Sequence, residues 1–291
     1  ATALIVSGMK PIPEEPPAKA APQSRADTTV SSLLTHATEW KEDTNPSGWL
    51  MSEKLDGVRV FWNPSNKTLY ARTGRPISSV PDTWKSTLPN IQIDGELWLG
   101  HGKVDELMTV MKGVTKKKSQ DLWKDIKLFV IDAPQIQGNL ESRLNELKKL
   151  QPSWNENVKL ISHVICKDKN HFEEFKKDVL SQGGEGVVLR NPTSAYESGR
   201  TSNFIKWKQY FDAEVKFLKR HHLNVALVCQ QSNGKQVVVR CPTEVYNNPP
   251  KPGTIVTVQH EGVFETGTLK YPYFVRERHD VDFTVNKNNR V

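Results

Sequence analysis

The chain has 291 residues, of which 36% are hydrophobic and 25% are charged, a composition typical of soluble globular proteins. No apolar run approaches the roughly 20 residues that a membrane-spanning helix needs, so we expect no membrane partner. Lysine and arginine number 40 against 33 acidic residues, and the formal charge of +7 favours an anionic partner such as nucleic acid. The three cysteines form no C-x-x-C pair, which argues against a disulfide scaffold and against structural zinc.

Composition divides the chain into three stretches. Residues 1–47 begin with a segment rich in proline and alanine and are expected to form a flexible leader, with a short helix as the alternative for residues 30–47. Residues 48–211 mix strand and helix patterns without a regular β-α-β alternation, which predicts an α+β domain. Residues 212–291 carry short β-like runs between turns, which predicts a small OB-fold barrel of the kind that often binds oligonucleotides.

Hydrophobic periodicity predicts the individual elements. Strands are expected at Gly57–Trp62, Thr68–Arg72, Ile91–Asp94, Lys127–Asp132, Gly186–Arg190, Val225–Cys229, Gln236–Cys241 and Thr254–Gln259. One helix is expected at Asn139–Leu150, with its leucines on one face. A second helix is expected to begin at the N-cap Asn170, with Glu173 three residues later as in a capping box, and to end at Gly183–Gly184.

The segment Ser52–Arg59, with the sequence SEKLDGVR, is the first candidate for chemistry. A lysine attacks a phosphoryl group only as the neutral amine, so Lys54 would have to lose its proton in the site. Asp56 lies two residues further on and can orient the amine or a metal ion, and Gly57 permits close approach of the backbone. A K-x-D-G sequence by itself is also typical of a surface turn.

Later segments supply the other groups that phosphoryl transfer needs. Glu96 follows a strand, Glu185 precedes one, and Arg72 ends another. Lys206 and Lys208 are two residues apart in an extended segment and so share one face. Carboxylates suit Mg²⁺ or ribose, and cations suit a triphosphate. Each residue alone could be an ordinary surface charge, and it is the ordered set that favours this chemistry.

The segments KLDGVR, ARTG, IDGELW, FVIDAP, GGEGVVLR and FIKWK resemble, in this order, the nucleotidyltransferase motifs of the ATP-dependent DNA ligases. The resemblance covers residues 48–291 and looks closest to the minimal ligases, namely the exported bacterial type and the small ligases of kinetoplastids and some other eukaryotes. It implies an adenylation domain at 48–211 followed by an OB-fold domain at 212–291. It also implies an enzyme that uses ATP and Mg²⁺, with Mn²⁺ as a substitute, to seal 3′-hydroxyl/5′-phosphate nicks through lysyl-AMP.

The resemblance implies catalytic roles for four residues. Lys54 is the expected nucleophile that forms lysyl-AMP, and Asp56 is expected to support the lysine or a metal ion. Lys206 and Lys208 are expected to contact the α-phosphate of ATP.

Nucleotide-binding roles are implied for a second set. Arg59 and Arg72 are expected at the AMP phosphate or at the 5′-phosphate of the nick, and Glu53 at the nucleotide. Glu96 is expected to bind ribose or a metal ion, and Glu185 to bind the metal ion.

The adenine site departs from the family pattern. Many relatives have a phenylalanine directly before the aspartate of FVIDAP, where this chain has Ile131. Phe129 lies two residues earlier and shares the same side of the strand. We therefore expect Phe129 or Ile131 to line the adenine pocket; an aliphatic side chain covers a base by dispersion, without aromatic stacking.

The C-terminal stretch resembles the end of a ligase OB-fold domain at Glu261–Phe264 and Thr268–Arg278. Arg276 and Arg278 share one face of a strand and are expected either to contact phosphate or to form an exposed basic edge. The basic runs Lys116–Lys118 and Lys216–His222 suit solvated faces or DNA backbone contacts. Arg190, beside Glu185, is expected in the site or packed at its edge.

Two other readings remain open at this stage. An RNA ligase or a GTP-using capping enzyme shares the K-x-D-G sequence, and a nucleic-acid-binding module without catalysis would share the basic charge. For the ligase we expect nicked duplex DNA as the partner, a monomeric state, and repair or replication proteins as further partners. We expect an intracellular DNA compartment, mitochondrion or nucleus, with the bacterial periplasm as the alternative.

Overall fold

The computed structural model describes residues 33–113 and 121–286 of the chain. The chain forms two compact units, residues 1–207 and 208–291, whereas we expected the boundary between residues 211 and 212. The lysine run Lys116–Lys118 and most of the expected leader lie outside the described residues. Within the described part of the chain, no helix is long and apolar enough to span a membrane.

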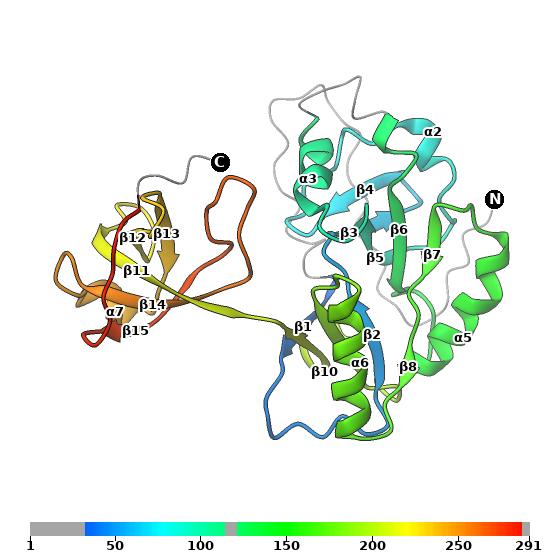
Figure 1. Ribbon diagram of the computed structural model, residues 1–291. Coiled ribbons are helices and arrows are strands. Elements are labelled where there is room, and N and C mark those ends of the chain that lie inside the picture. Colours follow the sequence, from blue (N-terminus) through cyan, green and yellow to red (C-terminus); the bar gives the residue numbers. More distant parts are fainter. Residues whose placement is uncertain (1–32, 114–120, 287–291) are drawn as a thin grey trace. The chain divides into compact units, whose positions relative to one another are not determined.

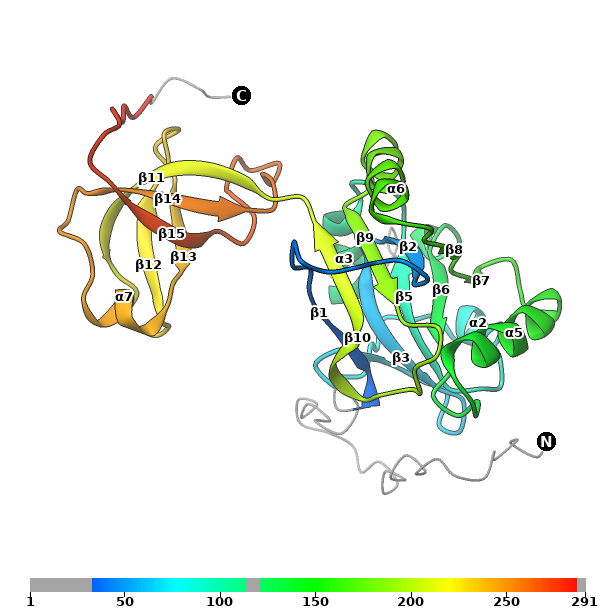
Figure 2. The same ribbon diagram turned by 90° about the horizontal axis from the view of Figure 1, so that it is seen from below.

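The first unit contains a five-stranded sheet in the order β1-β10-β9-β2-β8 (Figure 1; β9 is labelled in Figure 2). Its strands are β1 (Thr35–Glu39), β10 (Gly199–Lys208), β9 (Gly186–Arg190), β2 (Leu50–Lys54) and β8 (Val164–Ile165). β1 is parallel to β10, whereas β2 is antiparallel to both β9 and β8. The expected leader therefore does not extend to residue 47, because residues 35–39 form a strand of this sheet. The partner of that strand is distant in sequence, so no local pattern indicated the pairing.

Helix α6 (Lys169–Ser181) covers one face of this first sheet (Figure 2). Phe172 and Val179 of the helix pack against Met51 of β2 and Leu189 of β9. Because Met51 faces the helix, residues at the alternate positions of β2 face away from it.

The N-terminus of α6 differs from the prediction. Its N-cap is Asp168, whose carboxylate accepts a hydrogen bond from the amide of His171 at 2.8 Å, so the expected N-cap at Asn170 was wrong. Glu173 pairs with Lys176 at 2.7 Å. Asp168 lies two residues before Asn170 in an extended conformation, and its carboxylate pairs with a free amide of the first helical turn. The capping-box pattern at Asn170 did not reveal this.

The second sheet of this unit has the order β4-β3-β5-β6-β7. Its strands are β4 (Thr68–Ala71), β3 (Val58–Asn63), β5 (Ile93–Trp98), β6 (Lys127–Asp132) and β7 (Val158–Leu160). Only the β6–β7 pair is parallel among these strands. The accompanying helices are α2 (Asp82–Lys85), α3 (Val104–Lys112), α5 (Leu140–Leu150) and the short 3-10 helix η1 (Gln151–Ser153).

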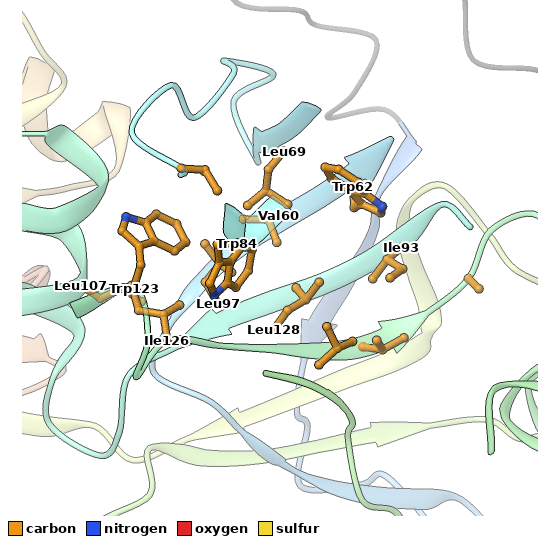
Figure 3. Packing of buried hydrophobic residues seen from close by; sticks show 14 of the residues in the cluster. Val60, Trp62, Leu69, Trp84, Ile93, Leu97, Leu107, Trp123, Ile126 and Leu128 are labelled. Atoms are coloured by element: carbon orange, nitrogen blue, oxygen red, sulfur yellow. The ribbon is translucent and has the colours of Figure 1, made fainter. Parts of the chain in front are cut away.

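One face of the second sheet carries a large hydrophobic core (Figure 3). Val60, Leu97 and Leu128 come from three adjacent strands and are fully buried. Trp84 and Trp123 cover them, with their ring centroids 4.9 Å apart in an edge-on arrangement. Both tryptophans therefore belong to the core.

The opposite face of the second sheet carries Arg59 and Glu96, which alternation directs away from the core, beside a small apolar cluster that includes Phe61 and Tyr70. Lys54 likewise faces away from α6 on the first sheet. Contacts join the two polar faces: Arg190 of β9 donates to Asp132 of β6 at 2.5 Å. Lys54 of the first sheet and Arg59 and Glu96 of the second thus lie on the sides of the two sheets that face each other.

The second unit is a closed barrel of five strands in the order β11-β12-β13-β15-β14. They are β11 (Phe211–Arg220), β12 (Ala226–Gln230), β13 (Gln236–Arg240), β14 (Ile255–His260) and β15 (Tyr273–Arg278), with the short helix α7 (Thr243–Asn247). Val215, Phe217, Leu227, Val239 and Val256 fill its interior. This agrees with the expected small OB-fold barrel.

Candidate active site

Lys54 ends β2, and the pairing of β2 with β9 brings it beside Glu185. Lys54 is opposite Gly186 in the antiparallel ladder, and its Nζ lies 3.2 Å from Oε1 of Glu185. The two side chains are 21% and 26% exposed, so the pair is sheltered but open to a ligand. The two charges that the sequence suggested for nucleotide chemistry thus lie together.

Gly57 allows the turn after Lys54 to lie directly against β5. A Cβ on Gly57 would lie 2.0 Å from the carbonyl oxygen of Leu97, which no side chain tolerates. The close approach predicted for this glycine is confirmed. It places the amide of Gly57 where it hydrogen-bonds the carboxylate of Glu96.

Four of the expected site residues form a row across the second sheet, on the face opposite its core. Arg59 is opposite Glu96 in the β3–β5 ladder, and Glu96 is opposite Phe129 in the β5–β6 ladder. Arg72 directly follows Ala71, which is opposite Val60, and so takes the position next to Arg59. Strand register alone therefore orders Arg72, Arg59, Glu96 and Phe129 across the sheet.

The pKa of the Glu96 carboxyl group is raised well above its usual value. Burial raises its pKa to about 7, against the opposing charges of Lys54 and Arg59, while the charge of Glu185 adds to the rise. Part of the Glu96 population is therefore neutral near physiological pH when no cation is present.

Arg59 forms an ion pair with the buried carboxylate of Asp94. Its Nε and one terminal nitrogen bind the two oxygens of Asp94 at 2.7 and 2.9 Å, and the same terminal nitrogen donates to the carbonyl of Thr35 at 2.8 Å. Burial alone would lower the pKa of Arg59, but the charge of Asp94 outweighs this and raises it. Tyr196 also donates to Asp94 at 2.9 Å. The structure thus adds Asp94 and Tyr196, which we did not predict, as the groups that orient Arg59.

The carboxylate of Asp56 accepts hydrogen bonds from an indole and from a backbone amide. It accepts hydrogen bonds from Nε1 of Trp98 at 3.0 Å and from the amide of Gly102 at 2.9 Å. These bonds join the turn after Lys54 to the loop that follows β5. Asp56 therefore fixes the loop beside Lys54, and Trp98 takes part in this contact.

Glu53 lies on the opposite side of β2 from Lys54 because adjacent strand residues alternate. Its Oε1 is 2.5 Å from Nε2 of His101, in the same loop that Asp56 holds. Glu53 thereby anchors this loop, and its predicted contact with the nucleotide stays a prediction. His101 escaped the sequence analysis because an isolated histidine after a strand carries no motif.

The two candidates for the adenine pocket differ in exposure. Ile131 is 8% exposed, whereas Phe129 is half-buried and its ring meets Trp98 edge-on at a centroid distance of 5.6 Å. Trp98 in turn meets His101 edge-on at 5.2 Å. An aromatic group of Phe129, Trp98 and His101 therefore lies next to Glu96.

Lys206 and Lys208 both end β10 and pair with different acids. Lys206 lies 3.3 Å from Glu39 of the neighbouring β1. Lys208 is the first residue of the barrel unit; it lies 2.7 Å from Glu261 of the same unit and is only 14% exposed. In this arrangement the lysines expected at the α-phosphate are held by carboxylates.

Comparison with known proteins supplies the family. The ATP dependent DNA ligase domain matches residues 30–208. The chain belongs to the ATP-dependent DNA ligase family. A DNA ligase of Haemophilus influenzae is 33% identical over 240 residues, which covers 79% of this chain and 87% of that protein.

Solved ligase structures agree with this ligase in fold. A structure from a structure–function analysis of Lig E DNA ligases, on DNA binding with a minimal scaffold, has a TM-score of 0.74 and 28% identity. That alignment covers 84% of this chain and 98% of the other. The ATP complex of the bacteriophage T7 ligase has a TM-score of 0.51 at 13% identity, covers 86% of this chain and 100% of the other, and supports the fold alone. The expected α+β nucleotidyltransferase domain followed by an OB-fold is confirmed.

Behind the site, the ligase contains a second buried carboxylate network. Asp132 binds Arg143 at 2.9 Å and Arg190 at 2.5 Å, and all three side chains are almost completely buried. Burial would raise the pKa of Asp132, but the two guanidinium groups hold it below its usual value. Of the two readings for Arg190, packing at the edge of the site is the one that the contacts support.

Two of the basic residues singled out in the barrel, Arg278 and His221, have partners within it. Arg278 pairs with Glu214 at 3.2 Å and with Asp280 at 2.8 Å, whereas Arg276 is exposed. Nδ1 of His221 accepts hydrogen bonds from two backbone amides of the following turn. Arg278 and His221 thus have structural partners, and Arg276 remains the more accessible member of the pair on β15.

Proposed function

We propose that this ligase seals nicks in duplex DNA with 3′-hydroxyl and 5′-phosphate ends, through lysyl-AMP formed on Lys54. The observation that carries the proposal is the placement of Lys54 at the end of β2, 3.2 Å from Glu185 and facing the polar side of the second sheet. The expected nucleophile and an acid that can orient it thus lie beside the row of side chains proposed to bind phosphate and base.

The reaction has three balanced steps. The Nζ of Lys54 loses its proton and bonds to the α-phosphorus of ATP, while the bond to the bridging oxygen breaks and pyrophosphate leaves. A 5′-phosphate oxygen of DNA then bonds to this phosphorus, and the phosphorus–nitrogen bond breaks to return the lysine. Finally the 3′-hydroxyl attacks the activated 5′-phosphorus and AMP leaves. Enzymes catalyse such phosphoryl transfers mainly by positioning the reacting groups and by neutralising the charge on the phosphate oxygens.

Side chains of the described residues divide this work. Phe129 offers an aromatic surface to adenine, and Glu96 next to it is placed for the ribose hydroxyls. Arg59, fixed by Asp94, and Arg72 beside it offer cations to phosphate. Lys206 reaches the α-phosphate once nucleotide competes with Glu39 for it.

The carboxylates of the candidate site, Glu96 and Glu185, are ligands that suit Mg²⁺. Among the described residues there is no group of three potential metal-binding side chains, but Mg²⁺ in nucleotide sites uses one or two carboxylates together with phosphate oxygens. Glu96 and Glu185, whose charges repel each other, would supply those carboxylates. The bound ion would neutralise charge on the phosphates; Mn²⁺ prefers similar oxygen ligands.

The test is sealing of a labelled nicked duplex by the pure protein with ATP and Mg²⁺. Matched substrates carry a DNA nick, an RNA nick or a 5′-hydroxyl nick, and parallel reactions contain GTP in place of ATP. We expect ATP-dependent sealing of the DNA nick with a 5′-phosphate. Preference for the RNA nick or for GTP would indicate an RNA ligase or a capping-type enzyme, and binding without lysyl-AMP would indicate an inactive binding module.

A further inference from the structure

Glu39, the last residue of β1, is an acid that no motif singled out. It is directly opposite Lys206 in the parallel β1–β10 ladder, and its Oε1 lies 3.3 Å from the lysine Nζ. The next residue, Trp40, stacks on Phe172 of α6, so Glu39 lies on the opposite side of the sheet. Glu39 and Lys206 therefore share the side of the sheet on which Lys54 is found.

The strand order fixes the direction in which this ion pair holds Lys206. In the order β1-β10-β9-β2, the strand of Lys206 lies between Glu39 on one side and, on the other, β9 and the strand of Lys54. Neighbouring strands are about 4.8 Å apart, so β10 is roughly 10 Å from β2. Glu39 thus draws the ammonium group of Lys206 toward the edge of the sheet, away from the amine that attacks the α-phosphate.

The Glu39–Lys206 pair can open without disturbing the fold. The side chain of Glu39 is 54% exposed and that of Lys206 is 24% exposed, and ion pairs open to solvent contribute little to stability. Lysine carries its charge on a flexible four-carbon stem, which allows the ammonium group to move to another anion within reach. The carboxylate of Glu39 and an α-phosphate beside Lys54 are therefore alternative partners for the same cation.

We propose that Glu39 sets the affinity of the site for the nucleotide phosphate by competing with that phosphate for Lys206. This inference rests on the ligase function proposed above, in which Lys206 contacts the α-phosphate of ATP. Binding of the nucleotide breaks the Glu39–Lys206 pair, and the pair forms again when AMP leaves. Glu39 is thus a positioning residue that acts through Lys206. It raises the ATP concentration needed for half-maximal lysyl-AMP formation and favours release of AMP, and it leaves the rate at saturating ATP unchanged.

The experiment compares wild type, Glu39→Gln, Lys206→Ala and the double variant, each freed of bound AMP by pyrophosphate. Calorimetry gives the affinities for AMP and for adenosine, and single-turnover labelling at increasing ATP gives the maximal rate and the half-saturating concentration. We expect Glu39→Gln to bind AMP and ATP roughly three- to ten-fold more tightly, with the maximal rate of lysyl-AMP formation within about twofold of wild type. Adenosine has no phosphate, so its affinity should not change. In the Lys206→Ala background, Glu39→Gln should leave the affinity for AMP unchanged.

Glu42→Gln is the matched control, since Glu42 is an exposed acid in the connection between β1 and β2, 4.0 Å from Lys169. It removes the same charge and should bind AMP as wild type does. Unchanged or weaker AMP binding by Glu39→Gln, or a reduced maximal rate, would overturn the proposal. An equal gain in affinity in Glu42→Gln or in the Lys206→Ala background would also overturn it, because the effect would then be one of general charge. Failure of the ligase function itself would appear differently, as a wild-type chain that forms no lysyl-AMP and seals no nick.

Discussion

Lys54 Nζ and Glu185 Oε1 lie 3.2 Å apart although 131 positions separate the two residues. The antiparallel pairing of β2 with β9 creates this contact, and it places a carboxylate beside the amine that must lose a proton.

Glu185→Gln keeps the shape of the side chain but removes its charge. We expect the rate of lysyl-AMP formation to fall roughly 100-fold, because the amine loses its orienting charge and the metal ion loses one carboxylate. Single-turnover labelling with ATP measures this rate. Glu173→Gln, which removes the ion pair with Lys176 on α6, is the control and should leave the rate unchanged. Wild-type labelling by Glu185→Gln would contradict the role of the pair.

Phe129→Leu should weaken ATP binding more than it slows chemistry. Loss of the aromatic surface beside Trp98 is expected to raise the KM for ATP by roughly 10-fold while kcat changes little. Ile131→Val removes one methyl group from the more buried neighbour and should change KM less. If the Ile131 variant shows the larger change in KM, then Ile131 lines the adenine pocket instead.

Asp56→Asn should loosen the loop that follows β5. The carboxylate accepts one bond from Trp98 and another from the amide of Gly102, and a carboxamide offers only one acceptor oxygen for the two donors. We expect faster hydrogen exchange at the Gly102 amide together with slower lysyl-AMP formation. Asp105→Asn, in the first turn of α3, is the control. Unchanged exchange at Gly102 would remove the basis for the positioning role of Asp56.

Glu96→Gln should change the pH dependence of stability. Folding raises the pKa of Glu96 from 4.5 to about 7, so the stability contributed by its protonated form is fully present below pH 4.5 and is lost as pH rises through 7. Without metal ions, the variant should match wild type near pH 5 and exceed it by about 2 kcal/mol at pH 8. Urea unfolding in EDTA at both pH values tests this, and a variant that is equally less stable at both would refute the burial argument.

The sequence predicted elements well wherever local pattern decides structure. The run Lys127–Asp132 has the observed bounds of β6, and the leucine spacing after Asn139 located α5. The strand β1 was missed because its pairing with β10 is long-range, and its contacts with Arg59 and Arg200 have no local signature.

The sequence indicated which residues belong to the candidate site, but it did not indicate most of the contacts between them. The order of the motifs predicted that Lys54 and Glu185 belong to the site, and the pairing of β2 with β9 places them in contact. Sequence could not show that Asp94 holds Arg59, that Asp56 binds the loop after β5, or that Glu53 faces His101. These outcomes depend on which side of a strand each residue faces once two sheets pack, and spacing within a motif does not determine that.

The most direct test of this account is labelling by ATP that carries a radioactive α-phosphate, after pyrophosphate treatment to remove any bound AMP. Wild type, Lys54→Ala and the exposed control Lys159→Ala are incubated with Mg²⁺, denatured and examined for label. We predict acid-stable label on wild type and on the Lys159 variant, with none on the Lys54 variant. Label that persists on the Lys54 variant, or a wild-type chain that takes up none, would contradict the assignment of Lys54 as the nucleophile.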